Sequence, residues 1–226
     1  RRHLTDGLIY SPLALGTGDE AAMLDLPYPL VLLGERVFHP RIDHVTMQNT
    51  PAAKAATEHL LAQGRRRIVA LGPNPEQEVG SAPLRFTGYR AALAEAGIAP
   101  DRALEVPTSR AWTHATGART VARLVEERVD FDAVFAFNDS LALGAMHELQ
   151  VRGLRVPDDV AVIGFDAIEE GRYSNPTLTT IDPGRAEIPR EAVRMIDERK
   201  RGVAGAPSRV APAFRLVEGG STGAEE

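Results

Sequence analysis

Four side chains that can bind a polar molecule each follow the end of a separate apolar run. They are Arg85, Trp112, Asn138 and Asp166, and Ser81 lies shortly before Arg85. Together they offer a planar set of donors, an aromatic face, an amide and a carboxylate. A buried sugar hydroxyl needs both a donor and an acceptor, and the C–H face of a sugar stacks on aromatic rings. This set therefore favours non-covalent binding of a hydroxyl-rich ligand.

Each of these side chains also has a purely structural explanation. Asn138 or Asp139 can cap the helix that follows, Asp166 can be a turn residue, Arg85 a surface charge and Trp112 a packing aromatic. If the apolar runs are parallel strands, however, their carboxyl ends meet at one edge of the sheet, where ligands bind. The convergence of four such residues on one edge favours a binding site.

Other chemistry has weaker support in the sequence. The segment Gly16–Ala21 matches a dinucleotide fingerprint, and Glu35 lies where an acid would bind a ribose. The first glycine of that motif must directly follow a strand, yet residues 11–15 intervene. There is no cysteine, no phosphate-binding loop and no nucleophile–base pair, so we expect neither an enzyme nor a cofactor.

A metal site is a further alternative that the residues suggest only weakly. His39, Asp43 and His44 are close in sequence, but Pro40 prevents the regular helix that would align them. Such residues in a loop are usually solvated, and we expect no bound metal.

Composition limits the class of protein. The 226 residues are 43% hydrophobic and 25% charged, as in globular proteins, and no apolar run approaches the ~20 residues of a membrane helix. A net charge of −5 argues against binding of DNA by this chain itself. The lack of cysteine and of a visible secretory signal fits a cytoplasmic location.

Apolar runs alternate with amphipathic segments along the chain, which predicts an α/β fold with mostly parallel sheets flanked by helices. In the region from Gln48 to Ile181 the pattern is nearly that of a complete doubly wound unit. A helix over 186–200 and two groups of shorter runs require a second layer. The predicted strands cover residues 7–10, 29–33, 44–47, 68–72, 103–106, 133–137, 160–165, 178–181 and 214–217.

The predicted strands and helices divide the chain into two lobes connected by several crossings. Residues 1–47 and 184–205 are expected to form part of an N-terminal lobe, and residues 48–183 and 206–222 a C-terminal lobe. Residues 223–226 are expected to form a flexible tail, and the Gly-rich, acidic stretch from Glu218 onward to be loose.

A set of motifs, specific in its order and spacing, resembles the LacI/GalR family of bacterial transcription regulators over about residues 6–222. The motifs lie at Thr57–Ile68, Arg85–Tyr89, Phe137–Met146, Gly153–Val160, Gly164–Asp166 and Pro176–Ile181. The resemblance implies two periplasmic-binding-protein-like lobes, a small effector in the cleft between them, and a homodimer. It also implies that operator DNA is bound by a helix-turn-helix headpiece, which this sequence does not contain.

The resemblance also assigns residues to the effector. Arg85, Trp112, Asn138 and Asp166 fall on effector-contacting positions, with Ser81 beside them. On the N-terminal lobe, Tyr10, Ser11 and Gly34 match cleft positions, although other members often carry an acid at the position of Gly34. Arg185 replaces an aromatic residue, which leaves room for a more polar or anionic effector. The first strand and helix of this lobe are expected upstream of Thr5, so the N-terminal lobe is incomplete.

The sequence thus predicts the ligand-sensing domain of a LacI-type regulator that binds a sugar or sugar-like metabolite. Two other classes remain open. A transport-associated sugar-binding protein would share the lobes, and an NAD-dependent oxidoreductase would need a nucleotide site.

Overall fold

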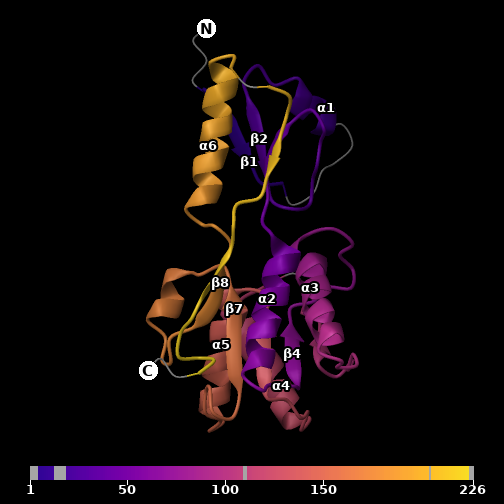
Figure 1. Cartoon of the computed structure of the whole chain (residues 1–226), viewed down its shortest axis with the longest axis vertical. Coiled ribbons are helices and arrows are strands. Elements are labelled where there is room, and N and C mark those ends of the chain that lie inside the picture. Colours follow the sequence, from indigo (N-terminus) through magenta and orange to yellow (C-terminus); the bar gives the residue numbers. More distant parts are fainter. Residues whose placement is uncertain (1–4, 13–18, 109–110, 204, 224–226) are drawn as a thin grey trace. The chain divides into compact units, whose positions relative to one another are not determined.

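The chain folds into two compact units, which are described separately (Figure 1). The computed structural model describes residues 5–12, 19–108, 111–203 and 205–223. The first unit comprises residues 1–48, 79–81 and 184–213, and the second unit comprises residues 49–78, 82–183 and 214–226.

The second unit is built on a six-stranded sheet in the order β10-β8-β7-β6-β4-β5. All neighbouring strands are parallel except β10, which is antiparallel to β8. The predicted α/β class is therefore confirmed. The strands are β4 (Ile68–Leu71), β5 (Glu105–Val106), β6 (Ala133–Ala136), β7 (Ala161–Phe165), β8 (Thr179–Asp182) and β10 (Arg215–Val217).

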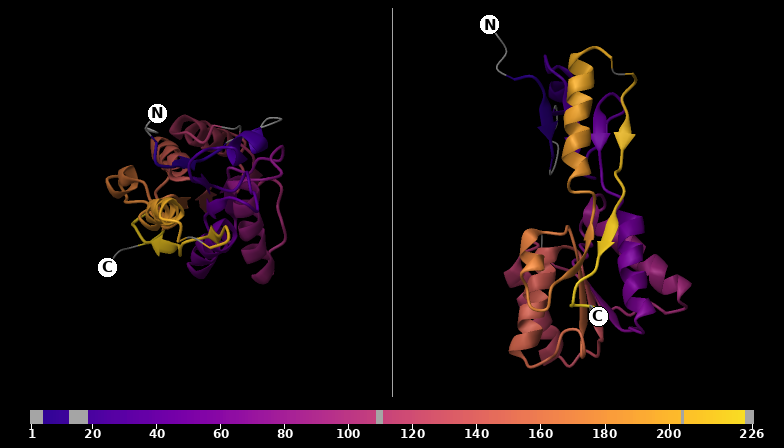
Figure 2. Two further views of the ribbon diagram at one scale, coloured as in Figure 1. Left: turned by 90° about the horizontal axis from the view of Figure 1, so that it is seen from above. Right: turned by 60° about the vertical axis from the view of Figure 1, so that its left-hand side comes forward.

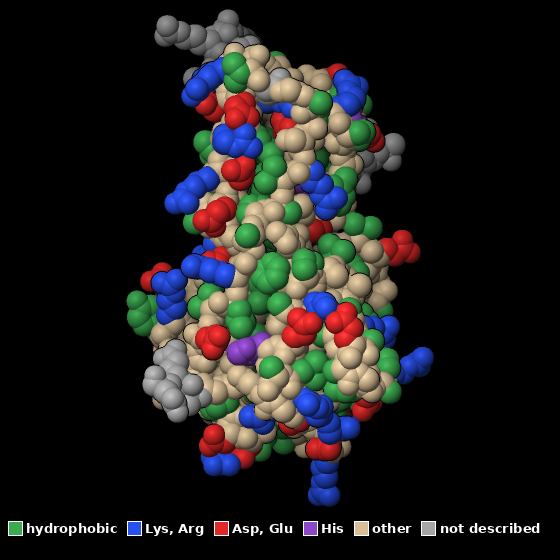
Figure 3. All heavy atoms as spheres, viewed as in Figure 1, with side chains coloured by type: hydrophobic (Ala, Val, Ile, Leu, Met, Phe, Trp, Pro, Cys, Tyr) green, Lys and Arg blue, Asp and Glu red, His purple; other side chains and the backbone are tan. Residues whose placement is uncertain are grey.

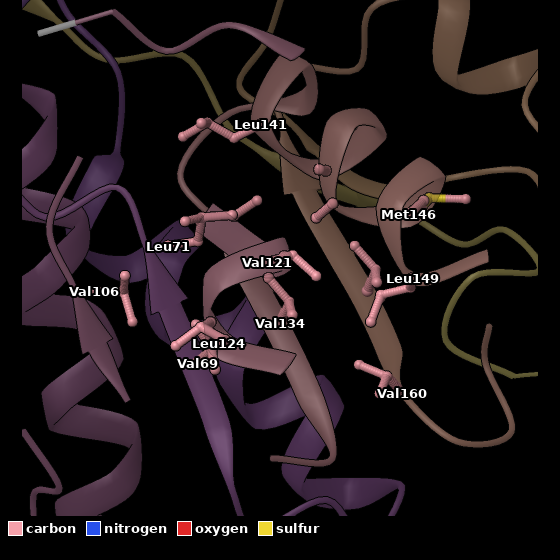
Figure 4. Close-up of a cluster of buried hydrophobic side chains, with 14 of the residues drawn as sticks. Val69, Leu71, Val106, Val121, Leu124, Val134, Leu141, Met146, Leu149 and Val160 are labelled. Carbon is pink, nitrogen blue, oxygen red and sulfur yellow. The ribbon is translucent and has the colours of Figure 1, made fainter. Parts of the chain in front are cut away.

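Helices cover both faces of this sheet. Strand side chains alternate between the faces, so Val69 and Val134 pack with α4 and α5 in one apolar cluster (Figure 4). Helix α2 lies against β6, β7, β8 and β10. The helices are α2 (Asn49–Ala62), α3 (Ser81–Glu95), α4 (His114–Glu126) and α5 (Asp139–Val151), with a short 3-10 helix η1 (Glu169–Arg172).

The first unit contains a four-stranded parallel sheet in the order β1-β2-β3-β9. Leu30 and Leu32 of β2 pack with Met23 of α1, whereas Val31 packs with Met195 of α6. The two helices therefore cover opposite faces of the sheet (Figure 2). The elements are β1 (Leu8–Tyr10), α1 (Asp19–Leu24), β2 (Leu30–Leu33), β3 (Asp43–Val45), α6 (Glu187–Lys200) and β9 (Arg209–Val210).

The outer face of α6 is a solvated, charged surface. Arg194 forms ion pairs with Glu191 and Glu198, and Arg201 pairs with Asp197. Acidic and basic side chains therefore alternate along this helix (Figure 3). Pairs of this kind at helical spacing satisfy one another and add little stability.

The structure corrects three predictions from the sequence. Gln48 and residues 79–81, expected in the C-terminal lobe, belong to the first unit. Strand β9 pairs with β3, so residues 206–213 belong to the first unit and not to the C-terminal lobe. The stretch after Glu218 is not loose, because the Ser221 hydroxyl is buried and donates to the carbonyl of Val162. Residues 224–226 of the expected tail lie outside the described residues.

No helix in the described part of the chain is long and apolar enough to span a bilayer.

Candidate functional site

Arg85 is the centre of a polar cluster at the carboxyl ends of β6 and β7. Only 2% of the residue is exposed. Its Nε donates to Oδ1 of Asn49 (2.8 Å), its Nη1 donates to the carbonyl of Phe137, and its Nη2 lies 3.5 Å from Oδ1 of Asp166. The guanidinium also lies over the ring of Phe165, 3.5 Å from the centroid. Arg85 is therefore not a surface charge but a fixed, buried cation.

Trp112 borders this cluster and also packs on the core. Its ring is partly buried against the apolar cluster between α4, α5 and the sheet. It meets the ring of Phe137 edge-on, with centroids 6.2 Å apart, and its centroid lies 5.6 Å from the Arg85 guanidinium carbon. The predicted proximity of Trp112 and Arg85 is confirmed, and so is a packing role for the tryptophan.

Asn138 caps α5, as the structural alternative predicted. Its Oδ1 accepts the backbone N–H of Leu141 (2.9 Å), which is otherwise without an intrahelical partner. Its Nδ2 donates to the carbonyl of Trp112 (3.2 Å). The amide therefore fixes the backbone of Trp112 to the start of α5. A contact between Asn138 and a ligand stays a prediction.

Asp166 lies in a strained turn directly after β7. Its φ is 111° and that of Ala167 is 50°, both in the left-handed region that few residues other than glycine adopt. The backbone N–H of Asp166 donates to the carbonyl of Ile181 (2.8 Å), and its side chain is 37% exposed. Strained backbone of this kind concentrates at functional sites, where surrounding structure holds it.

Asp139 is a buried acid beneath this turn that sequence reasoning considered only as a possible helix cap. Its Oδ2 accepts the N–H of Ile168 (2.8 Å), and its Oδ1 accepts the hydroxyl of Thr180 (2.6 Å). Burial raises the pKa of Asp139 to about 7, with a smaller contribution from the nearby Asp166 carboxylate, while the hydrogen bonds oppose the rise. The one sequence signal for this role is Gly164, a glycine inside a buried strand.

The remaining predicted ligand residues belong to the first unit. Ser81, at the start of α3, donates its hydroxyl to Oε2 of Glu35 (3.0 Å). Tyr10 ends β1 and is 38% exposed. Gly34 follows β2 with a φ of 91°, and the exposed Arg185 precedes α6. Ser11, which follows Tyr10, is exposed as well. The structure thus brings Arg85, Trp112, Asn138 and Asp166 together in the second unit.

Glu35 has a structural role in place of the ribose-binding one that the dinucleotide alternative required. Only 4% of it is exposed. Its Oε1 accepts the hydroxyl of Thr46 and the N–H of Met47, and its Oε2 accepts the hydroxyl of Ser81. The carboxylate is therefore used within the first unit. Gly16 and Gly18 of the fingerprint lie outside the described residues.

The three residues considered for a metal site have separate partners. His39 pairs with Glu20 (3.0 Å), and Asp43 forms an ion pair with Arg199 (2.6 Å). Nε2 of His44 lies 2.5 Å from the carbonyl of Gly34. Among the described residues, no group of three or more His, Cys, Asp or Glu is arranged to hold a metal ion.

Comparison with known proteins agrees with this architecture. Residues 57–222 match the family of periplasmic binding protein-like domains. The transcriptional regulator CelR of Thermobifida fusca is 32% identical over 178 residues, which cover 78% of this chain and 51% of that protein. A structure described as a transcriptional regulator of the LacI family, from Sanguibacter keddieii, is 50% identical with a TM-score of 0.88. That alignment covers 98% of this chain and 81% of the other.

A CelR–cellobiose complex is also similar, with 28% identity and a TM-score of 0.84 over 96% of this chain and 66% of that one. The fold is therefore that of a periplasmic-binding-protein-like domain. Within that class, the chain belongs to the LacI family of transcriptional regulators. It spans about half the length of the curated relatives it matches. These relatives are regulators and not enzymes, which confirms the expectation that the chain is not an enzyme.

Proposed function

We propose that this chain senses a sugar or sugar-like metabolite, which it binds non-covalently at the carboxyl edge of the second unit's sheet. The observation that carries the proposal is the pairing of a fixed guanidinium with a partly exposed carboxylate. Nη2 of Arg85 lies 3.5 Å from Oδ1 of Asp166, whose side chain is 37% exposed. A donor and an acceptor side by side suit a hydroxyl that both gives and accepts a hydrogen bond.

The rigidity of the donor supports this function. Arg85 is held by Asn49 and by the carbonyl of Phe137, so little side-chain freedom remains to be lost on binding. The neighbouring ring of Trp112 supplies a surface for the C–H face of a sugar. The complex of the similar regulator CelR with cellobiose makes a β-linked glucose disaccharide the first ligand to test.

The proposal extends to further contacts with the effector. Asn138, Ser81, Tyr10, Ser11 and Gly34 are additional candidate effector contacts. Gly34 offers no carboxylate and Arg185 adds a cation. An effector with an anionic or strongly polar group would suit that combination.

We further propose that the protein acts as a cytoplasmic homodimer that binds operator DNA through a helix-turn-helix headpiece. Exposed apolar side chains support an interface on the second unit: Tyr173 is 80% exposed and Val151 is 66% exposed. The loop that carries Tyr173 is tied to the end of α5, because Nε2 of Gln150 donates to the carbonyl of Asn175 (2.6 Å). Replacement of Tyr173 by Asp is expected to shift sedimentation toward the monomer, and unchanged sedimentation would count against this interface.

The function is tested by a ligand screen with calorimetric confirmation. Cellobiose, other disaccharides, monosaccharides and a nucleotide such as NAD are compared by thermal shift, and hits are measured by calorimetry. The proposal predicts saturable binding of a carbohydrate and no stabilisation by NAD. Stabilisation by NAD alone would favour the oxidoreductase alternative and contradict the proposal.

A further inference from the structure

Asp139 is a carboxyl group buried near the ends of β6 and β7, against Thr180 of β8. It is the first residue of α5 and is fully buried. In the described part of the structure, none of the ion pairs includes it. A carboxyl group in such a place is costly unless hydrogen bonds compensate for its lost hydration. The hydrogen-bond partners of Asp139 therefore indicate which part of the structure this carboxyl group stabilises.

Those partners lie at the end of the turn that carries Asp166 and in the neighbouring strand β8. The N–H of Ile168 donates to Oδ2 of Asp139, and the hydroxyl of Thr180 donates to Oδ1. The same hydroxyl accepts the N–H of Ala167 (3.3 Å). One carboxyl group thus holds both the end of the turn and the residue of β8 that supports its middle.

Helix capping does not explain this acid. The residue before Asp139, Asn138, already caps the helix by accepting the N–H of Leu141. The bonds of Asp139 go instead to Ile168, in the loop after β7, and to Thr180 of β8, which lie 29 and 41 residues away in the sequence. The helix N-terminus adds a favourable dipole for the carboxylate, but the partners are those of a turn anchor.

The adjacent strand is shaped to admit this carboxyl group. A Cβ atom at Gly164 would overlap Oδ1 of Asp139. Gly164 lies in the interior of β7, where a glycine weakens the strand and commonly marks the close approach of another group. The absence of a side chain at this position is explained by the need to bring Asp139 against the strand.

We propose that Asp139 is a positioning residue for the effector site: its carboxyl group holds the left-handed turn at Asp166–Ala167 and so sets Asp166 beside Arg85. This inference rests on the proposed function, since it assigns a role at the same site. Asp139 itself does not touch the effector. It acts by stabilising a backbone conformation that two non-glycine residues adopt only under restraint.

Amide hydrogen exchange tests the positioning role without any ligand. Replacement of Asp139 by Asn removes one acceptor and places an N–H₂ group where acceptors are needed, so the N–H of Ile168 is expected to exchange at least tenfold faster. Thr180→Val removes the bonded hydroxyl and is expected to act similarly, whereas Thr180→Ser keeps the hydroxyl and is expected to restore protection. This Thr180 pair decides the question if Asp139→Asn does not fold.

Asp132 offers a matched control in the same unit. Its carboxylate accepts the backbone N–H groups of Arg66 (2.8 Å) and Arg67 (3.0 Å), at the other end of the sheet. Asp132→Asn is expected to lower stability without changing the exchange of Ile168. Equal acceleration of Ile168 exchange in the Asp132 and Asp139 variants would show general destabilisation and would overturn the proposal.

Calorimetry with cellobiose then links the turn to binding. We expect Asp139→Asn and Thr180→Val to weaken cellobiose binding at least tenfold, and Thr180→Ser and Asp132→Asn to change it less than threefold. Faster exchange with unchanged affinity would overturn the positioning role. If the wild-type chain binds no carbohydrate, the proposed function fails, while the exchange data still decide whether Asp139 holds the turn.

Discussion

The strand ends of the two units carry similar residue types but use them differently. In the first unit, the Glu35 carboxylate is 4% exposed and is consumed by three internal donors. In the second unit, the Asp166 side chain is 37% exposed beside a fixed guanidinium. The Glu35 carboxylate is therefore used within its own unit, whereas that of Asp166 stays partly exposed in a turn whose backbone other residues hold. Asp139 provides that support in the second unit.

The largest expected effect comes from removing the buried cation. Arg85→Ala removes a large, fully buried side chain and its hydrogen bonds to Asn49 and to the Phe137 carbonyl, so we expect a loss of about 3–5 kcal/mol in the free energy of unfolding. Urea denaturation measures it. Arg90→Ala is the control on the same helix, because Arg90 pairs with Glu105 at the surface and is expected to cost about 1 kcal/mol or less. Equal effects would show that Arg85 is not a structural centre of the site.

A methyl group at Gly164 is expected to have the next largest effect. Gly164→Ala forces the new Cβ against the Asp139 carboxyl group, and overpacking of this kind costs about 1–3 kcal/mol. Denaturation and amide exchange of Ile168 are measured together. Gly205→Ala, where a Cβ meets no atom within 4 Å, is the control and is expected to be nearly neutral. Unchanged protection of the Ile168 N–H in Gly164→Ala would contradict the claim that Gly164 makes room for the carboxyl group that holds the turn.

The pH dependence of the free energy of unfolding provides a further test of the Asp139 carboxyl group. Its folded-state pKa of about 7 lies above the ordinary value of 3.8, so between these values the folded state binds more protons than the unfolded state. The contribution of Asp139 to stability is thus greatest at low pH and falls as the pH rises toward about 7. The histidines with lowered pKa values, His44 and His59, give the opposite slope.

The histidine contributions cancel in a comparison of wild type with Asp139→Asn at pH 5 and pH 8. We expect wild type to lose stability relative to the variant as the pH rises. If the difference in the free energy of unfolding between the two proteins is the same at pH 5 and pH 8, the pKa of Asp139 is not raised in the folded state.

The smallest expected effect on stability is that of Trp112→Phe, since an aromatic ring still packs beside Phe137. We expect a change of about 1 kcal/mol or less in unfolding and a complete loss of the ligand-dependent emission change, because Trp112 is the only tryptophan. Emission that does not respond to a ligand confirmed by calorimetry would assign Trp112 to packing alone.

Most of the fold was predictable because the strands of the second unit are short, apolar and bounded by turn residues. β9 was not, since Arg209–Val210 is a two-residue edge strand without a pattern of its own. Among the candidate site residues, Trp112, Asn138 and Asp166 lie in segments that follow strands, and Arg85 lies in α3, the helix after β4, so all four could be found from the local pattern. The role proposed for Asp139 could not, because its hydrogen-bond partner Thr180 lies 41 residues further along the chain.

Sugar binding that depends on Asp166 is the central claim, and calorimetric titration of cellobiose into wild type and Asp166→Asn tests it most directly. The amide keeps the size of the side chain but removes the charged acceptor, and loss of one such hydrogen bond costs about 1–3 kcal/mol. The account predicts saturable binding to wild type, weakened about tenfold or more in the variant, with melting temperatures within a few degrees of each other. Equal affinities in the two proteins would contradict it.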